Sequence, residues 1–174
     1  MALTPIKYPP RLDLARIPTP LQFLSRASDK WGAGKRLWMK RDDLTGSALT
    51  GNKVRKLEFI AAHALDHGLH TLVTCGGVQS NHCRATALVA AQLGLDCHLV
   101  LRADDEPEQN TGNFLLDQLA GATFEILPAK EWATQLKTIY ASRESEFADA
   151  GRPALMIPTG GSDSLGVWGY IAAT

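Results

Sequence analysis

Short apolar runs alternate with longer segments that carry apolar residues at helical spacing through most of the chain. Runs of four or five residues rich in β-branched and large apolar side chains are typical of buried strands. The expected strands lie at residues 37–41, 71–75, 97–101, 123–127 and 154–157. The expected helices lie at residues 52–67, 83–93, 113–120 and 131–148, with a last one that starts near 165. This alternation predicts an α/β fold, with an open, mainly parallel sheet and helices on both of its faces.

The helix that starts near Asn52, its expected N-cap, carries three cations in its first turn. Gly68 is placed to end it in the left-handed conformation. Lys53, Arg55 and Lys56 lie at the positive end of the helix dipole, where the dipole and the neighbouring cations disfavour an ammonium group. A neutral lysine amine is the nucleophile that forms a Schiff base with an aldehyde or ketone. The alternative is a solvated basic surface, where exposure and salt relieve the repulsion.

A second polar cluster follows the expected strand at 71–75, which Gly76 and Gly77 are expected to end. In an open α/β sheet, ligands bind at the carboxyl ends of the strands, and two glycines let the backbone approach a ligand closely. Ser80 and Asn81 then lie at a helix N-terminus, where free N–H groups bind carboxylate or phosphate. The alternative is a plain N-cap. The glycine spacing matches neither the dinucleotide-binding fingerprint nor the Walker A loop.

Composition and charge exclude several classes of partner. The formal net charge is zero, which gives no reason to expect nucleic acid or an anionic membrane. No apolar run has the length needed to cross a bilayer, and the segment 1–7 lacks the apolar core of a secretory signal. An odd number of cysteines without such a signal indicates reduced thiols, and therefore a cytoplasmic protein. The three are Cys75, Cys83 and Cys97.

A metal site is not expected. His63 and His67 lie four residues apart on the first predicted helix, and His70 follows closely, which is a spacing that can chelate a metal. The same spacing is typical of a solvated helix face, and no carboxylate or thiolate partner accompanies it. The chain also lacks a Cys-x-x-Cys pair, so a structural zinc site is not predicted.

Several runs of the chain closely resemble one family of enzymes. These runs are Lys40–Thr45, Gly51–Glu58, Gly77–Arg84 and Ile157–Ser162 followed by Leu165–Gly166, with Pro20–Leu21 near the start. The family comprises the pyridoxal-phosphate-dependent D-cysteine desulfhydrases and 1-aminocyclopropane-1-carboxylate deaminases. The resemblance implies a tryptophan-synthase-β-like fold that is incomplete here. It also implies that residues 1–55 begin a large cofactor domain, residues 56–160 form a small α/β domain, and residues 161–174 begin the return into the large domain.

The resemblance also implies roles for individual residues. Lys53 would hold pyridoxal phosphate as a Schiff base and act as base or proton shuttle, and Asn81 would hydrogen-bond the phenolic oxygen of the cofactor. Ser80, a catalytic candidate, would receive the substrate carboxylate together with the neighbouring backbone N–H groups. Lys56, one turn after Lys53, would reach the cofactor phosphate. The substrate-binding set predicted on this basis is Gln79, Ser80, Asn81 and His82.

The implied reaction releases ammonia and a 2-oxo acid from a small amino acid. His82 stands where the deaminases carry glutamine, which favours D-cysteine as substrate, with pyruvate, hydrogen sulfide and ammonia as products. The alternative substrate is 1-aminocyclopropane-1-carboxylate, which would give 2-oxobutyrate. Two rivals are a β-replacement synthase, which shares the chemistry but not the sequence around the lysine, and a non-catalytic α/β module that binds anions.

The end of the chain and its length add one more expectation. The segment 167–174 has a helical apolar pattern that stops without a cap or a polar tail. Members of the family are considerably longer, and their glycine-rich phosphate loop lies beyond the matched region. We therefore expect an N-terminal portion that is not a competent enzyme alone, and a homodimer for the complete protein.

Overall fold

The computed structural model of the chain describes residues 7–108 and 111–173. Most of the segment 1–7, on which the prediction about a secretory signal rests, lies outside the described residues, as does the last residue of the apolar C-terminal segment. Within the described parts, no helix has the length and apolar character that a membrane crossing requires.

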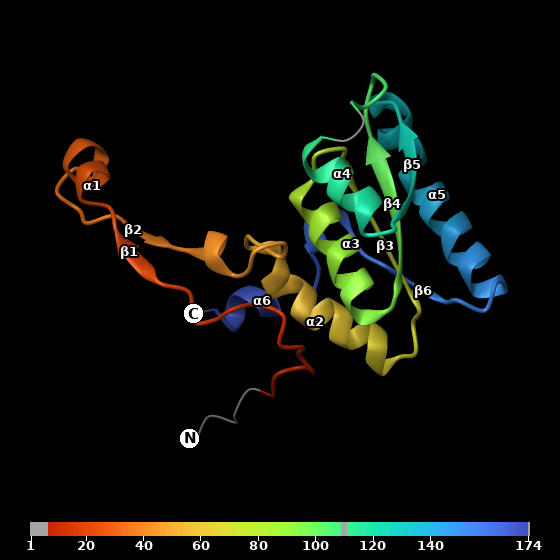
Figure 1. Ribbon diagram of the computed structural model, residues 1–174, viewed down its shortest axis with the longest axis horizontal. Helices are drawn as coiled ribbons and strands as arrows, with labels where there is room; N and C mark the ends of the chain where they lie inside the picture. Colours follow the sequence, from red (N-terminus) through yellow and green to blue (C-terminus); the bar gives the residue numbers. More distant parts are fainter. Residues whose placement is uncertain (1–6, 109–110, 174) are drawn as a thin grey trace.

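Four parallel strands form the main sheet, as the alternating pattern predicts (Figure 1). They are β3 (Thr71–Gly77), β4 (Asp96–Arg102), β5 (Thr123–Leu127) and β6 (Ala154–Met156), in the spatial order β5-β4-β3-β6. The bounds of β5 match the expected strand. The prediction that Gly76 and Gly77 end β3 is wrong, because both are paired with β4, opposite Leu101 and Arg102. A neighbouring strand thus keeps these glycines extended.

The helices cover both faces of this sheet. They are α2 (Lys53–Asp66), α3 (Asn81–Leu93), α4 (Gly112–Leu119) and α5 (Ala129–Asp149), and the short α6 (Trp168–Ile171) lies against α2. The sheet grows in one direction from β3 to β5, and α5 then carries the chain back past β4 and β3 to β6. Because crossovers between parallel strands are right-handed, this reversal places α5 on the face opposite α3 and α4 (Figure 1). The predicted fold class is confirmed.

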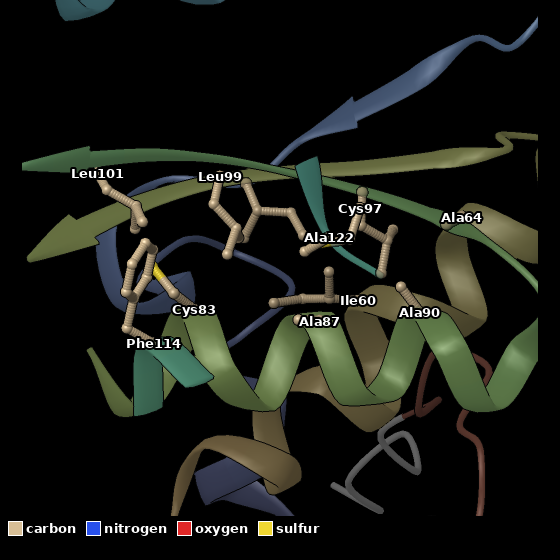
Figure 2. Close-up of a cluster of buried hydrophobic side chains, with 12 residues drawn as sticks. Ile60, Ala64, Cys83, Ala87, Ala90, Cys97, Leu99, Leu101, Phe114 and Ala122 are labelled. Carbon is tan, nitrogen blue, oxygen red and sulfur yellow. The ribbon is translucent and has the colours of Figure 1, made fainter. Parts of the chain in front are cut away.

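The core lies between the sheet and α2 and α3 (Figure 2). Ala87 and Ala90 of α3 face the sheet with side chains small enough to let the helix approach it closely, and Ile60 of α2 fills the space beside them. Leu99 and Leu101 of β4 are fully buried above them. Each such leucine contributes about 1.5–3 kcal/mol by leaving water. This packing fixes α2 and α3 against the sheet, and with them the two helix N-termini that carry the predicted site residues.

The structure confirms the predicted glycine at the C-terminal end of α2, but Asn52 does not act as the predicted N-cap. Gly68 has a φ of +64°, and its N–H and that of Leu69 donate to Leu65 and Ala64, as in a Schellman motif. At the other terminus Asn52 precedes the helix but makes no side-chain cap. Its φ and ψ of −67° and −15° are already helical, which takes the side chain away from the first turn. The amide donates instead to the Tyr170 hydroxyl.

The N-terminal part of the chain forms an arm beside this body (Figure 1). The expected strand at 37–41 is present as β2 (Trp38–Lys40), but it pairs antiparallel with β1 (Leu21–Phe23), and α1 (Ser25–Trp31) lies between them. The short 3-10 helix η1 (Asp42–Leu44) then leads the chain towards α2. Several large apolar side chains of the arm are exposed, among them Leu21, Phe23, Trp31, Trp38 and Met39.

Buried charges join the segment before the arm to the body. Glu58 of α2 is 1% exposed and accepts hydrogen bonds from Arg11 Nε at 2.9 Å and from the backbone N–H groups of Leu14 and Ala15 at 3.1 and 2.9 Å. A buried carboxylate needs such a set of partners, because an unpaired charge in the interior is costly. Glu58 therefore fixes the path of the chain over α2.

The last helix begins later than expected. The segment from Leu165 to Val167 forms turns, because the Asp163 carboxylate accepts the N–H groups of Leu165 and Gly166 at 3.1 and 2.7 Å. This local bonding competes with an α-helical start. Helix α6 then packs on α2 at Gly169, where a Cβ would collide with the carbonyl of Arg55.

All three thiols are free and buried. Burial raises the pKa of the Cys83 thiol to about 12 and holds the pKa of Cys97 well above its ordinary value, so both stay protonated at neutral pH. His63 and His67 stack with their ring centroids 3.9 Å apart. Among the described residues, no group of three or more His, Cys, Asp or Glu side chains is arranged to hold a metal ion.

Candidate active site

The predicted site residues gather at the carboxyl ends of β3 and β6, where the direction of strand addition reverses. Such a switch point is where open α/β sheets bind ligands. Two glycine-containing turns lie there. The first glycine turn comprises residues 76–80, which are the last two residues of β3 and the turn that leads to α3. The second glycine turn comprises residues 159–162 after β6, including the 3-10 helix η2 (Thr159–Gly161). The N-terminus of α2 packs against the second turn.

The first glycine turn is closed by Ser80. Its Oγ accepts the N–H groups of His82 and Cys83, both at 3.2 Å, and its own N–H donates to Gly77 at 2.8 Å. A Cβ at Gly76 would lie 2.8 Å from Ser80 Oγ, so only glycine fits there without displacing the cap. Ser80 is thus the N-cap of α3, as the simpler alternative states. Because its oxygen is the acceptor in both bonds, its hydroxyl hydrogen remains available to another acceptor.

Gln79 and Asn81 are connected to α4. The Gln79 side chain accepts the N–H of Asn113 at 2.8 Å, so it turns towards the first turn of α4. The Asn113 amide nitrogen donates to the Gln79 carbonyl at 2.9 Å and to Asn81 Oδ1 at 3.0 Å. Asn81 itself is exposed at the N-terminus of α3. The two predicted residues therefore differ in what they offer to a ligand. The Gln79 side chain is bonded to α4, whereas the amide nitrogen of Asn81 faces away from Asn113.

The second glycine turn is held by Lys56. Gly160 and Gly161 have φ values of +69° and +58°, in the left-handed region that favours glycine. Lys56 Nζ donates to the Gly160 carbonyl at 3.0 Å and to Ser162 Oγ at 2.9 Å. Burial lowers the pKa of Lys56, and the nearby ammonium group of Lys53 lowers it further. The predicted crowding of cations at the start of this helix therefore lowers the pKa of Lys56.

Lys53 is half-buried beside the same turn. Its Nζ lies 3.3 Å from the position that a Cβ on Gly160 would occupy. A side chain at 160 would therefore fill the space that the amine reaches. Arg55, the third predicted cation, leaves this cluster and pairs with the Asp42 carboxylate at 2.7 Å. The two lysines thus face the second turn, while the arginine joins α2 to η1.

His82 lies beneath the second turn, and its bonds define its tautomer. It is 2% exposed, and its Nε2 lies 3.0 Å from Thr74 Oγ1. Because the Thr74 hydroxyl donates to the Ile157 carbonyl at 3.1 Å, its oxygen accepts the Nε2–H of His82. Nδ1 is then an unprotonated acceptor, and it has no hydrogen-bond partner among the described residues. Burial, helped by the charges of Lys53 and Lys56, lowers the pKa of His82 to about 3, so the ring is neutral.

The structure adds residues for which the sequence predicted no individual role in the site. These are Thr74, Asn113, Gly160 and Ser162. One signal for the second turn was present in the sequence, because Gly160 and Gly161 follow a strand as Gly76 and Gly77 do. No local signal identifies Thr74 or Asn113, which meet the predicted residues only in three dimensions.

The groups gathered here suit an anionic ligand that carries a carbonyl carbon. Lys53 and Lys56 supply amine or ammonium groups, Ser80 supplies a hydroxyl hydrogen, and Asn81 supplies amide hydrogens. Beside the amine, Gly160 leaves the space that a Cβ would fill. A buried acceptor, His82 Nδ1, lies near the two lysines. Cationic and N–H donors favour phosphate and carboxylate, and an amine is the nucleophile for a carbonyl.

Comparisons with known proteins agree with this chemistry. Residues 12–174 match the family described as "Pyridoxal-phosphate dependent enzyme". The chain is 42% identical over 171 residues to the bifunctional D-cysteine desulfhydrase/1-aminocyclopropane-1-carboxylate deaminase of Arabidopsis thaliana, covering 92% of the chain and 41% of that protein. It is 47% identical over 166 residues to the D-cysteine desulfhydrase of Serratia proteamaculans, covering 93% of the chain and 49% of that protein.

A solved structure is also similar. The crystal structure of a homologue of 1-aminocyclopropane-1-carboxylate deaminase matches 95% of the chain and 49% of its own length, with a TM-score of 0.83 and 40% identity. The chain spans about half the length of the curated relatives it matches, between 41% and 52%.

Proposed function

The chain belongs to the family of pyridoxal-phosphate-dependent enzymes, and we propose that it carries the part of such an enzyme that holds the cofactor and the acid group of a small amino acid. The position of the Lys53 amine, against the space left open by Gly160, is the observation that carries the proposal. When bound, pyridoxal phosphate withdraws electrons from the substrate and so allows bonds at its α- and β-carbons to break.

Three residues are proposed to hold the cofactor. Lys53 would bind its aldehyde carbon covalently, and Asn81 would donate an amide hydrogen to its phenolic oxygen. Lys56 would attract the phosphate, because an ammonium group has three hydrogens and two of them are used for Gly160 and Ser162. The neutral ring of His82 adds no charge to this set and supports the second turn from below.

Ser80 is proposed to bind the substrate carboxylate. Its oxygen already accepts two backbone hydrogens, so the hydroxyl hydrogen is the group that it can offer to an anion. Lys53, once its amine is free, would move a proton at the α- or β-carbon of the substrate. For Gln79 and His82 we propose support of the site instead of direct substrate contact. Gln79 is bonded to α4, and His82 is buried.

We propose D-cysteine as the substrate, which the reaction would convert to pyruvate, hydrogen sulfide and ammonia. The relative from Serratia proteamaculans carries this activity in its name. The alternative is ring opening of 1-aminocyclopropane-1-carboxylate to 2-oxobutyrate and ammonia. The name of the relative from Arabidopsis thaliana includes this deaminase activity, and the relative from Thermotoga maritima is named a putative deaminase of the same substrate. From the resemblance of the sequence we also propose that the complete protein is a cytoplasmic homodimer. On the same basis we propose that the domain boundaries lie after residues 55 and 160.

The native gene product that carries this chain provides the test. Incubation with pyridoxal phosphate should give the visible absorbance of the lysine-bound cofactor, and Lys53→Ala should abolish it. Lys130→Ala, on the exposed surface of α5, is the matched control and should leave it unchanged. Wild-type protein without this absorbance would contradict the proposal and favour a non-catalytic module that binds anions.

Turnover separates the two substrates. Pyruvate and sulfide formed from D-cysteine would support the desulfhydrase, whereas 2-oxobutyrate formed from 1-aminocyclopropane-1-carboxylate would support the deaminase. Ser80→Ala should raise the KM for the amino acid about tenfold or more while the cofactor absorbance persists, because one hydrogen bond to a charged group is lost. Loss of the cofactor with an unchanged KM would contradict the role of Ser80.

A further inference from the structure

Asn113, which lies outside the predicted site, determines the orientation of the Asn81 amide. The amide nitrogen of Asn113 has two hydrogens, and the structure uses both. One goes to the backbone carbonyl of Gln79 at 2.9 Å, and the other goes to Asn81 Oδ1 at 3.0 Å. Because a backbone carbonyl only accepts hydrogen bonds, the first bond fixes which end of the Asn113 amide is the nitrogen.

The second bond then fixes the polarity of Asn81. Its Oδ1 is turned towards Asn113, so its Nδ2 is turned away with its hydrogens free for a ligand. An asparagine in this orientation offers only donors to a ligand, and it selects an oxygen that accepts. We propose that Asn113 is a positioning residue which holds Asn81 as a hydrogen-bond donor towards the cofactor. The inference rests on the proposed function of Asn81.

The surroundings of Asn113 are built for this contact. Its backbone N–H donates to the Gln79 side chain at 2.8 Å, which fixes the first turn of α4 beside the first glycine turn. The preceding residue, Gly112, has a φ of +54°, and a Cβ there would collide with Gln79 Oε1. Glycine at 112 therefore permits the approach of Gln79, and the two hydrogen bonds that Asn113 donates to Gln79 bring α4 close to Asn81.

Asn113→Asp reverses the polarity of the contact. A carboxylate accepts but does not donate, so it would draw the Asn81 amide hydrogens and turn Oδ1 towards the ligand. An acidic residue is tolerated in the first turn of a helix, so α4 is expected to form. In the native gene product, loss of a donor to the chromophore oxygen should raise the pH midpoint of the cofactor absorbance by about one pH unit. Asn113→Ala should give a smaller shift in the same direction.

Thr111→Val is the matched control. Thr111 lies at the same end of α4, but its hydroxyl donates to the Glu108 carbonyl, at 3.2 Å, and not to Asn81. This variant should keep the wild-type midpoint. An Asn113→Asp protein that binds the cofactor with the wild-type midpoint would overturn the role of Asn113.

A measurement without cofactor separates this inference from the proposed function. In the nitrogen-15 NMR spectrum of the cofactor-free protein, the side-chain amide signals of Asn81 should move in Asn113→Ala and stay in place in Thr111→Val. Unchanged Asn81 signals in Asn113→Ala would overturn the inference. If the wild-type protein takes up no cofactor but the Asn81 signals move, the contact stands and the proposed function fails.

Discussion

The two glycine turns at the carboxyl ends of β3 and β6 look alike in the sequence, but different parts of the chain hold them. The first turn is closed by its own neighbour, Ser80, which bonds residues two and three positions further along. The second turn is held by Lys56, which lies 104 residues before Gly160 in the chain. The first turn is therefore a local structure that its sequence specifies, whereas the second depends on the packed fold. A ligand bound between the two turns would therefore contact one turn that its own sequence specifies and one turn whose position depends on the packing of α2.

Gly161→Ala should cause the largest loss of stability in this comparison. The new Cβ would have a φ of +58° and would lie 3.0 Å from Ile60 Cδ1 and 3.1 Å from His82 Cε1. Backbone strain and overpacking together should lower the free energy of unfolding by about 3 kcal/mol, measured by urea denaturation. Gly94→Ala has the same strain with open space around it and should cost about 1 kcal/mol. Equal losses would show that the second turn is not packed against α2 and α3.

The pH dependence of stability should reveal His82, which lies under the second turn. Its pKa is about 3 in the folded chain and 6.5 ordinarily. Below pH 6.5 the unfolded chain therefore binds a proton that the folded chain does not, and the free energy of unfolding falls as the pH drops. Between pH 7 and 4.5 the wild type should lose about 2.5 kcal/mol more than His82→Gln.

Other buried groups also affect this pH range, among them His98, whose pKa burial lowers in both proteins alike, and Asp117. Burial raises the pKa of Asp117 to about 7, so the folded chain keeps a proton there that the unfolded chain releases, and stability from this group falls as the pH rises. Its contribution is present in both proteins and cancels in the difference. Parallel pH curves for the wild type and His82→Gln would contradict a neutral, buried His82.

Lys56→Met should loosen the second turn while leaving the first intact. The Gly160 carbonyl and the Ser162 hydroxyl would each lose a donor, which should cost about 2 kcal/mol. Hydrogen exchange should quicken at the Gly161 N–H, which bonds Pro158, and not at the Cys83 N–H, which bonds Ser80 of the first turn. Lys137→Met on the exposed side of α5 is the control, with a change below about 0.5 kcal/mol. Equal exchange at both turns would contradict the difference between them.

Ser80→Ala should have the smallest effect on stability and the opposite pattern of exchange. Loss of an N-cap costs about 1 kcal/mol, because two N–H groups at the start of α3 lose their acceptor. The N–H groups of His82 and Cys83 should exchange faster, while Gly161 should not change. Faster exchange at Gly161 as well would show that the two turns act as one unit.

The contrast also explains what the sequence reveals. The mainly apolar run 97–101 predicts β4, because a strand that is buried on both faces needs apolar side chains at nearly every position, and residues 97–101 are all buried. Gly68 predicts the end of α2 because a left-handed residue is a local requirement. The position of Ser80 at the start of α3 can likewise be predicted, because capping is also a local requirement.

Contacts between residues that are distant in the chain cannot be predicted from local sequence in this way. The extension of β3 through Gly76 and Gly77 depends on its pairing with β4, and the clamp of Lys56 on Gly160 depends on the packing of α2. The contact of Asn113 with Asn81 joins two helices that share no sequence motif. The direction of Arg55, which leaves the lysines for Asp42, is likewise decided by a partner 13 residues earlier in the chain.

The central claim is that the amine of Lys53 binds a carbonyl carbon between the two glycine turns. The most direct test is to reduce the native gene product with borohydride in the presence of pyridoxal phosphate and to map the modified peptide by mass spectrometry. The account predicts a single pyridoxyl group on Lys53. A group on Lys56 or on exposed lysines, with Lys53 unmodified, would contradict it.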